Sequence, residues 1–410
     1  MGDKVFFSSP LTHSDWMLHK GGPAWGDDGI REMLTHCRDA GIYRIYWRVF
    51  DSGRSMYFSK LIDCMDYKVH DEPYQFSPGY IPFPTDPEIV ERYNSLDYTG
   101  YDTLEAAVRI GHELGLEIWA WMTINEDDHG FGFTSRFSRE HPEYRWVMRD
   151  GRVLHSQMSF AFPEVREYKK ALVGEMLAYD IDGIFMDWLR TGDIRDNPHT
   201  DPEGIAAHGY EKPLVEEYIK RYGKDPHDNP NGDDAWVRLR VEPLTVFMRD
   251  VRKMVDAHTK KLGLSTMTAN PWGYRGHLPE QTRPNTPQWV IDMNFGYTDG
   301  SLNGLLVDIK TWAREGLVDE ADVAGYYRKP GTPLMAFDYL KNETEGRIKN
   351  VIYLWVPRSE AEVAKVLETA KEAGADHVLL WEADYIDSQP EPLRSATLKA
   401  MREAALEKCP

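Results

Sequence analysis

Residues 165–190 place a helix, a short buried strand and an acid in immediate succession. Apolar side chains recur at helical spacing from Val165 to Tyr179, and the run Ile184-Phe185-Met186 that follows is apolar on both faces. A strand that is apolar on both faces is typical of a parallel sheet covered by helices. This strand ends at Asp187, and α/β barrels place reactive groups at the carboxyl ends of their strands. We therefore predict that Asp187 lies at the centre of an active site.

The same alternation of helices and strands continues along almost the whole chain. Strands are expected at residues 5–9, 42–49, 117–123, 184–187, 264–268, 351–356 and 377–381, and the sixth strand at 289–295, 323–327 or 334–337. Eight such units without a linker-like stretch predict one (β/α)8 TIM barrel over residues 1–410. A doubly wound open sheet would need a glycine-rich turn after its first strand, and this chain has none there.

Two long irregular regions, residues 51–99 and 191–234, interrupt this pattern as insertions. Loops of such length inside a domain usually serve as lids or binding loops. The second region contains a short helical pattern from Leu214 to Tyr222, and a longer one follows from Ala235 to Leu262. Both insertions are therefore expected beside the site.

Charge and cysteine usage restrict the partners. The chain has 67 acidic and 48 basic residues, a net charge of −19 that repels nucleic acid and anionic membrane surfaces. Three scattered cysteines provide no disulfide framework, and no zinc or nucleotide motif is present, so no cofactor is expected. No signal peptide or membrane span is apparent, which favours a cytoplasmic protein; removal of a leader would make it secreted or periplasmic. The oligomeric state stays open.

Other carboxylates follow strands near the expected barrel mouth. Glycoside hydrolysis needs two, one as proton donor and one as nucleophile or base. Asp187 supplies the nucleophile or base, and the candidates for its partner are Glu382 first, then Glu126, then Asp292. A simpler interpretation exists for acids that follow a strand, because they often cap the next helix, and Asp127 is open to it.

Cations, amides and indoles gather at the same strand ends. Candidate substrate-binding residues are Arg48, Trp121, Asn125, Arg190, Asn270, Trp272, Asp292 and Trp381. Indoles can stack on sugar faces, although most large aromatic side chains fill cores. The two arginines could bind an anionic sugar or pair with a neighbouring acid. These residues favour a carbohydrate as the substrate.

Several motifs together resemble the family 10-like glycoside hydrolases. They are His141-Pro142-Glu143-Tyr144, Asp150-Gly151-Arg152, the helix start Phe162-Pro163-Glu164-Val165-Arg166-Glu167-Tyr168, the strand Asp182-Gly183-Ile184-Phe185-Met186-Asp187-Trp188-Leu189-Arg190, the helix–strand unit 101–121 and the segment 311–319. The resemblance covers roughly residues 100–330. It implies a TIM barrel that acts on glycans, with Asp187 and Arg190 as site residues. It also implies that 323–327 is the sixth strand and that 289–295 belongs to the fifth loop.

This chain departs from the family pattern at Leu189, where an aromatic residue often stands, and in the insertion 51–99. We expect a glycosidase of carbohydrate metabolism that degrades an oligo- or polysaccharide. Two alternatives stay open. One is a non-catalytic glycan-binding barrel, and the other is a lyase or isomerase that holds the carboxylate of a uronate sugar with Arg48 and Arg190.

Overall fold

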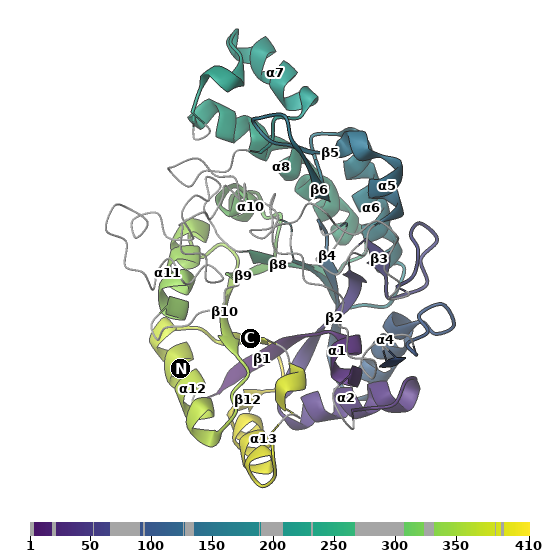
Figure 1. The fold of residues 1–410 in the computed structure, drawn as a ribbon. Helices are drawn as coiled ribbons and strands as arrows, with labels where there is room; N and C mark the ends of the chain where they lie inside the picture. The colour runs from purple at the N-terminus through teal and green to yellow at the C-terminus, as the bar shows by residue number, and fades with distance from the viewer. Residues whose placement is uncertain are drawn as a thin grey trace.

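Eight parallel strands close into a ring in the computed structural model of the protein (Figure 1). The structure describes residues 4–18, 22–51, 53–65, 91–92, 95–125, 127, 135–187, 189, 208–230, 233–266, 307–323, 332–381, 383–386 and 389–410. The ring strands are β1 (Val5–Leu11), β2 (Ile42–Asp51), β4 (Glu117–Thr123), β7 (Gly183–Asp187), β8 (Lys261–Thr266), β9 (Glu320–Val323), β10 (Lys349–Trp355) and β11 (His377–Trp381). Because β1 pairs in parallel with both β2 and β11, the sheet has no free edge there.

A helix follows each ring strand and lies outside the ring (Figure 1). These helices are α2 (Asp27–Asp39), α4 (Thr103–Glu113), α6 (Pro163–Leu177), α8 (Asp234–Ala257), α10 (Ile309–Glu315), α11 (Thr332–Thr344), α12 (Glu360–Ala373) and α13 (Leu393–Ala404). Local signals set their ends: Asp102 caps α4 by accepting from the backbone N–H groups of residues 104 and 105, and Gly374 ends α12 in the left-handed conformation. The predicted (β/α)8 TIM barrel is confirmed.

The sixth strand differs from its prediction. It is β9, Glu320–Val323, so the candidate 323–327 names the right part of the chain but begins three residues late. The candidate 334–337 is wrong, because it lies inside the helix α11. The third candidate, 289–295, lies outside the described residues. The helix expected to reach Leu262 ends at Ala257, because β8 already begins at Lys261.

The structure also contains shorter elements besides the eight strands of the ring and their helices. They are α1 (His13–Leu18), β3 (Arg54–Ser55), α5 (Arg136–Glu140), β5 (Arg145–Val147), β6 (Val153–Met158), α7 (Lys212–Tyr222), β12 (Ala405–Leu406) and three 3₁₀ turns at 142–144, 226–228 and 383–386. The helix predicted in the second insertion is confirmed as α7. This helix projects from the ring beside α8 (Figure 1). The antiparallel hairpin of β5 and β6 was not predicted from the sequence.

Four polar residues form a cluster at the amino ends of the strands, and three of them are buried inside the ring. Nη1 of Arg44 donates to both carboxylate oxygens of Glu320, at 2.9 and 2.7 Å, and Nε donates to Glu117 at 2.6 Å. The hydroxyl group of Tyr46 also donates to Glu320, at 2.8 Å. We call Arg44, Glu320, Glu117 and Tyr46 the polar plug. In this cluster the buried charges of Arg44 and Glu320 pair with each other, and the partly exposed Glu117 pairs with Arg44 from the rim.

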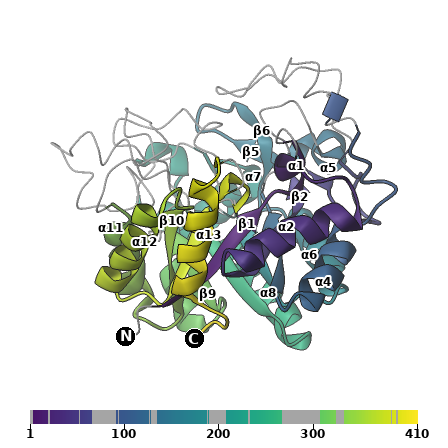
Figure 2. The same ribbon diagram turned by 90° about the horizontal axis from the view of Figure 1, so that it is seen from below.

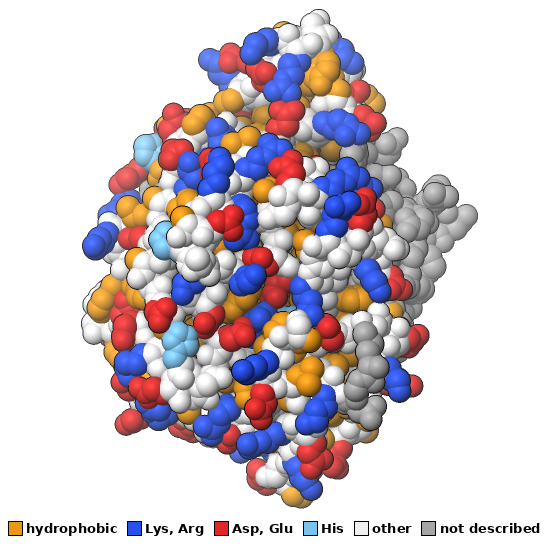
Figure 3. All heavy atoms as spheres, turned by 180° about the vertical axis from the view of Figure 1, so that it is seen from behind, with side chains coloured by type: hydrophobic (Ala, Val, Ile, Leu, Met, Phe, Trp, Pro, Cys, Tyr) orange, Lys and Arg blue, Asp and Glu red, His pale blue; other side chains and the backbone are white. Residues whose placement is uncertain are grey.

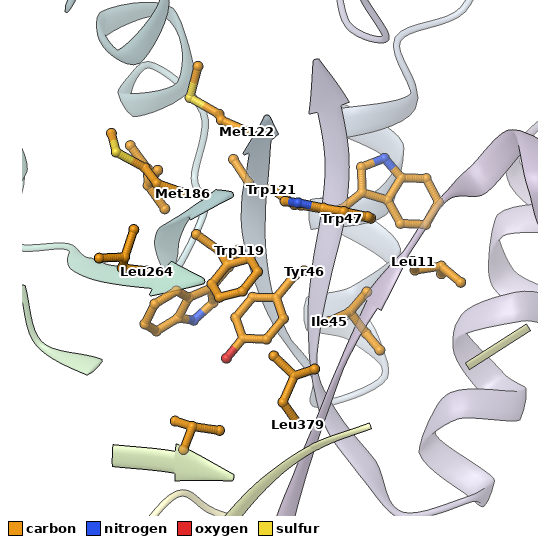
Figure 4. Packing of buried hydrophobic residues seen from close by; sticks show 14 of the residues in the cluster. Leu11, Ile45, Tyr46, Trp47, Trp119, Trp121, Met122, Met186, Leu264 and Leu379 are labelled. Carbon is orange, nitrogen blue, oxygen red and sulfur yellow. The ribbon is translucent and has the colours of Figure 1, made fainter. Parts of the chain in front are cut away.

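Aromatic rings fill the next layer toward the other end. Tyr46 stacks on Phe185 with ring centroids 4.0 Å apart, and Trp119 meets Tyr46 edge-on at 5.8 Å. Figure 4 shows the rings of Tyr46 and Trp119 side by side between the strands. Phe185 is buried and belongs to the barrel core. The layer therefore separates the polar plug from the carboxyl ends of the strands.

The two chain termini lie together at the amino end of the ring (Figure 2). On the face opposite to that of Figure 1, acidic and basic side chains are interspersed (Figure 3). Within the described part of the chain, no helix combines the length and the apolar character needed to cross a membrane.

Candidate active site

Asp187 ends β7, a strand whose residues are all buried. At its start, Gly183 allows close packing, because a Cβ there would lie 2.6 Å from the Trp119 ring. Phe185 points into the ring, and side chains alternate along a strand, so Asp187 faces the interior as well. Its side chain is 4% exposed, and Nε1 of Trp121 donates to Oδ2 at 3.3 Å. The indole therefore fixes the orientation of this carboxylate.

A second acid, Asp322, shares this part of the interior. Ser265 on β8 pairs in register with Asp322 on β9. On the other side of β8, Phe185 pairs with Gly263, so the register continues to place Asp187 beside Ser265. Residues paired across neighbouring strands point to the same face. Asp187, Ser265 and Asp322 thus form a row across three consecutive strands.

The setting of Asp322 favours its protonated form. The side chain is 1% exposed, and the hydroxyl group of Ser265 donates to Oδ1 at 2.9 Å. Burial raises the pKa of Asp322 well above its ordinary value, and the charges of Asp187 and Glu320 raise it further. The hydrogen bond from Ser265 acts in the opposite direction and lowers this pKa. Burial therefore favours the protonated form of Asp322, beside a second carboxyl group.

Asp322 was missed by the sequence analysis. The signal was the pair of acids at alternate positions, Glu320 and Asp322, which both face inward on one strand. Strand prediction favours apolar runs, so this acidic stretch was placed before the strand and not within it.

Three of the predicted substrate-binding residues meet beside the acids. The guanidinium carbon of Arg48 lies 5.1 Å from the centroid of the Trp121 ring, and Trp381 meets Trp121 edge-on at 5.7 Å. Tyr353 on β10 lies against Trp381 at 5.5 Å. Trp121 itself is 2% exposed, so its ring is part of the wall of the site and holds Asp187. Arg48, Trp121, Trp381 and Asp187 are thus brought together at the barrel mouth.

Of the other predicted site residues, one lies in the described part of the chain. Asn125 is buried directly after β4. The remaining ones, which lie outside the described residues, are Glu126, Arg190, Asn270, Trp272, Asp292 and Glu382. Their positions relative to Asp187 stay predictions.

Asp127 has a structural role that differs from the helix cap considered above. Its Oδ2 lies 2.5 Å from Nζ of Lys169 on α6, and both side chains are completely buried. Ser135, and not Asp127, caps the next helix, α5. Burial lowers the pKa of Lys169, and the neighbouring carboxylate opposes that effect. This ion pair fastens the chain after β4 to α6.

Across the described ranges, no group of three or more His, Cys, Asp or Glu side chains is arranged to hold a metal ion. The arrangement that the structure describes at the mouth is a buried acid with a raised pKa, an oriented carboxyl group and a wall of rings. This combination suits acid–base or nucleophilic chemistry on a substrate with apolar faces.

Known structures share this architecture. The catalytic domain of β-amylase from Paenibacillus polymyxa superposes with a TM-score of 0.58 at 11% identity, over 98% of this chain and 99% of that one. The PgaB (BpsB) glycoside hydrolase domain from Bordetella bronchiseptica gives 0.57 at 10% identity, over 99% of both chains. The endo-1,4-β-mannanase from Rhizomucor miehei gives 0.51 at 8% identity, over 98% and 94%. At such identities the similarity concerns the fold.

Sequence comparison gives the family. A search of curated proteins found no significant match. The sequence pattern of the glycosyl hydrolase-like 10 family, by contrast, matches residues 89–369, more than half of the chain. The matched range includes β4, β7, β8, β9 and β10, and with them Trp121, Asp187 and Asp322. The chain therefore belongs to the glycosyl hydrolase-like 10 family.

Proposed function

We propose that the protein is a glycoside hydrolase that cleaves an oligo- or polysaccharide with two carboxyl groups. Asp187 serves as nucleophile or base, and Asp322 serves as proton donor. The observation that carries this proposal is the placement of the two buried acids on either side of Ser265, at the carboxyl ends of the barrel strands, where Asp187 accepts a hydrogen bond from Trp121 and Asp322 accepts one from Ser265. Family membership supports the choice of glycans as substrates.

The two settings suit the two halves of the reaction. A proton donor must hold its proton until the glycosidic bond breaks, and burial favours the protonated form of Asp322 by raising its pKa. In the reaction, Asp322 would give this proton to the leaving oxygen. Asp187, held by the indole of Trp121, would attack the anomeric carbon or activate a water molecule there.

Glu382 and Glu126 stay alternative donors, and substrate choice separates them from Asp322. A 4-nitrophenyl glycoside has a leaving group that needs little protonation, whereas a natural glycosidic bond needs much. Loss of the true donor should therefore spare the aryl glycoside and slow polysaccharide cleavage by about 10²–10⁴-fold. Comparing Asp322→Asn, Glu382→Gln and Glu126→Gln on both substrates identifies the donor.

The first prediction concerns Asp187→Asn. A broad polysaccharide panel, scored for new reducing ends and for ultraviolet absorbance, should reveal hydrolysis by the unaltered protein. Asp187→Asn should lower turnover by at least about 10³-fold on natural and aryl substrates alike, because the amide cannot act as nucleophile or base. Its circular dichroism and melting temperature should stay close to those of the unaltered protein, since the two side chains have nearly the same shape.

Other outcomes would point elsewhere. Turnover retained by Asp187→Asn would remove this residue from the mechanism. Tight sugar binding without any product would favour a glycan-binding barrel. Ultraviolet-absorbing unsaturated products would favour a lyase that acts on uronates.

A further inference from the structure

Trp355 is the last residue of β10, and the residue is 36% exposed. In the parallel register it pairs with Trp381, as Tyr353 pairs with Leu379. Tyr353 contacts Trp381 inside the ring, and residues two apart on a strand share a face. The indole of Trp355 therefore stands on the inner face of β10, at the outer rim of the mouth.

Rings connect this rim to the reactive carboxyl group. Trp121, which donates to Asp187, meets Trp381, and Trp381 in turn lies against Tyr353. We call Trp121, Trp381 and Tyr353 the aromatic wall. Trp121 and Tyr353 are buried and Trp381 is half-buried, so the wall opens toward solvent as it approaches Trp355. A single exposed aromatic side chain is common on any protein, but this one extends a wall that begins at the acids.

We propose that Trp355 is a stacking platform for a pyranose ring of the substrate, at least one sugar unit away from the bond cleaved beside Asp187. This inference rests on the proposed function and specifies it, because a platform apart from the acids serves a chain of sugars and not a single glycoside. An exposed indole offers a flat apolar surface for the C–H face of a pyranose. The net charge of −19 disfavours anionic sugars, and stacking on an apolar ring needs no charge on the sugar, so the inferred substrate is an oligomer of neutral pyranoses.

The test separates binding from turnover. Asp187→Asn provides a background that holds the sugar without cleaving it, and isothermal titration calorimetry measures the dissociation constants of cellohexaose, mannohexaose and maltohexaose. Adding Trp355→Ala should weaken the hexasaccharide that binds by about 10–100-fold, as expected when one aromatic anchor is removed. The matching disaccharide is too short to reach the platform, so its affinity should fall much less. Trp355→Phe keeps an aromatic face and should recover most of the loss.

A matched control is available outside the mouth. Tyr222 on α7 is 45% exposed, and Tyr222→Ala should leave the hexasaccharide affinity unchanged. Circular dichroism checks that each variant is folded. In the active protein, Trp355→Ala should raise KM more for the hexasaccharide than for the disaccharide, because a remote contact contributes binding energy only when it is occupied.

The outcomes distinguish this inference from the proposed function. If Trp355→Ala binds the hexasaccharide as tightly as the background does, the platform is overturned, whatever the turnover. If Trp355→Ala weakens hexasaccharide binding, and the protein that keeps Asp187 releases no product, the platform stands and the hydrolase proposal fails. If none of the three hexasaccharides binds, a platform for neutral pyranose chains is overturned.

Discussion

Ser265 lies between the two acids and touches one of them. Its hydroxyl group donates to Asp322, and this hydrogen bond lowers the pKa of Asp322 against the larger effect of burial. The proposed donor works only while it is protonated, so its pKa sets the alkaline limit of activity. A neutral side chain on β8 thus adjusts the pH range of an acid on β9.

The second prediction follows for Ser265→Ala. Removing the hydroxyl group should raise the pKa of Asp322 further, so that the donor stays protonated to higher pH. The alkaline limb of the kcat/KM profile should therefore move upward by about one pH unit, the size expected for one hydrogen bond to a buried carboxylate. Ser265→Thr keeps a hydroxyl group and should restore the original limb. A shift toward lower pH, or no shift, would contradict the assigned hydrogen bond or the assigned donor.

Among the elements, the segment that leads into α7 is attached to α8 and β5 through buried contacts. Arg240 of α8 donates from Nη1 to the backbone carbonyl of His208 at 2.7 Å, and the ring of His208 stacks on Trp146 of β5. Glu211, directly before α7, is buried here and accepts from the backbone N–H of Val147 at 3.1 Å. Burial raises the pKa of Glu211 to about 7, although its backbone hydrogen bonds and the charge of Arg240 act to lower it.

The third prediction concerns the pH dependence of stability at Glu211. Its folded pKa of about 7 lies above its ordinary value of 4.5, so its stabilising contribution is full below pH 4.5 and is lost as pH rises through about 7. The free energy of unfolding should fall by up to roughly 3 kcal/mol over this window because of this group. Glu211→Gln cannot ionise and should flatten the fall.

Urea denaturation at several pH values between 5 and 8 measures this difference. Glu216→Gln is the matched control, because Glu216 lies on the exposed side of α7. It should keep the fall seen in the unaltered protein. Equal pH dependence in Glu211→Gln and the unaltered protein would show that Glu211 is ionised in the folded state.

The order of the elements could be predicted from sequence more reliably than the site could. The barrel follows from repeated helices and apolar strands, and the position of Asp187 at the end of one such strand follows from the same pattern. The strand β9 was misplaced because its inward positions carry Glu320 and Asp322, whose burial depends on partners from β2 and β8. Contacts between residues far apart in the chain decide such a strand, and local sequence does not contain them. The hairpin of β5 and β6 was missed for a similar reason, since its strands are short and partly polar.

At the scale of the whole molecule, the barrel interior divides into a closed end and a reactive end. The polar plug closes the amino ends of the strands, an aromatic layer lies above it, and the two acids lie at the carboxyl ends. In α/β barrels the amino end generally serves stability and the carboxyl end serves catalysis. The strand β9 spans this division, because Glu320 belongs to the plug and Asp322 to the site.

The fourth prediction compares these two acids, which are two residues apart on one strand. Glu320→Gln replaces the buried carboxylate beside Arg44 with a neutral amide and leaves the partly exposed Glu117 as the other carboxylate of the plug, so the free energy of unfolding should fall by about 3 kcal/mol. Once folded, this variant should keep its kcat on the cleaved polysaccharide within a few-fold, because Glu320 lies below the aromatic layer. Asp322→Asn removes the donor but no ion pair, so it should keep its stability and lose about 10²–10⁴-fold in polysaccharide turnover. Urea denaturation and kcat, measured on both variants, test the division directly. If both variants lose mainly stability, Asp322 is part of the barrel core; if both lose mainly turnover, the plug is not confined to a structural role.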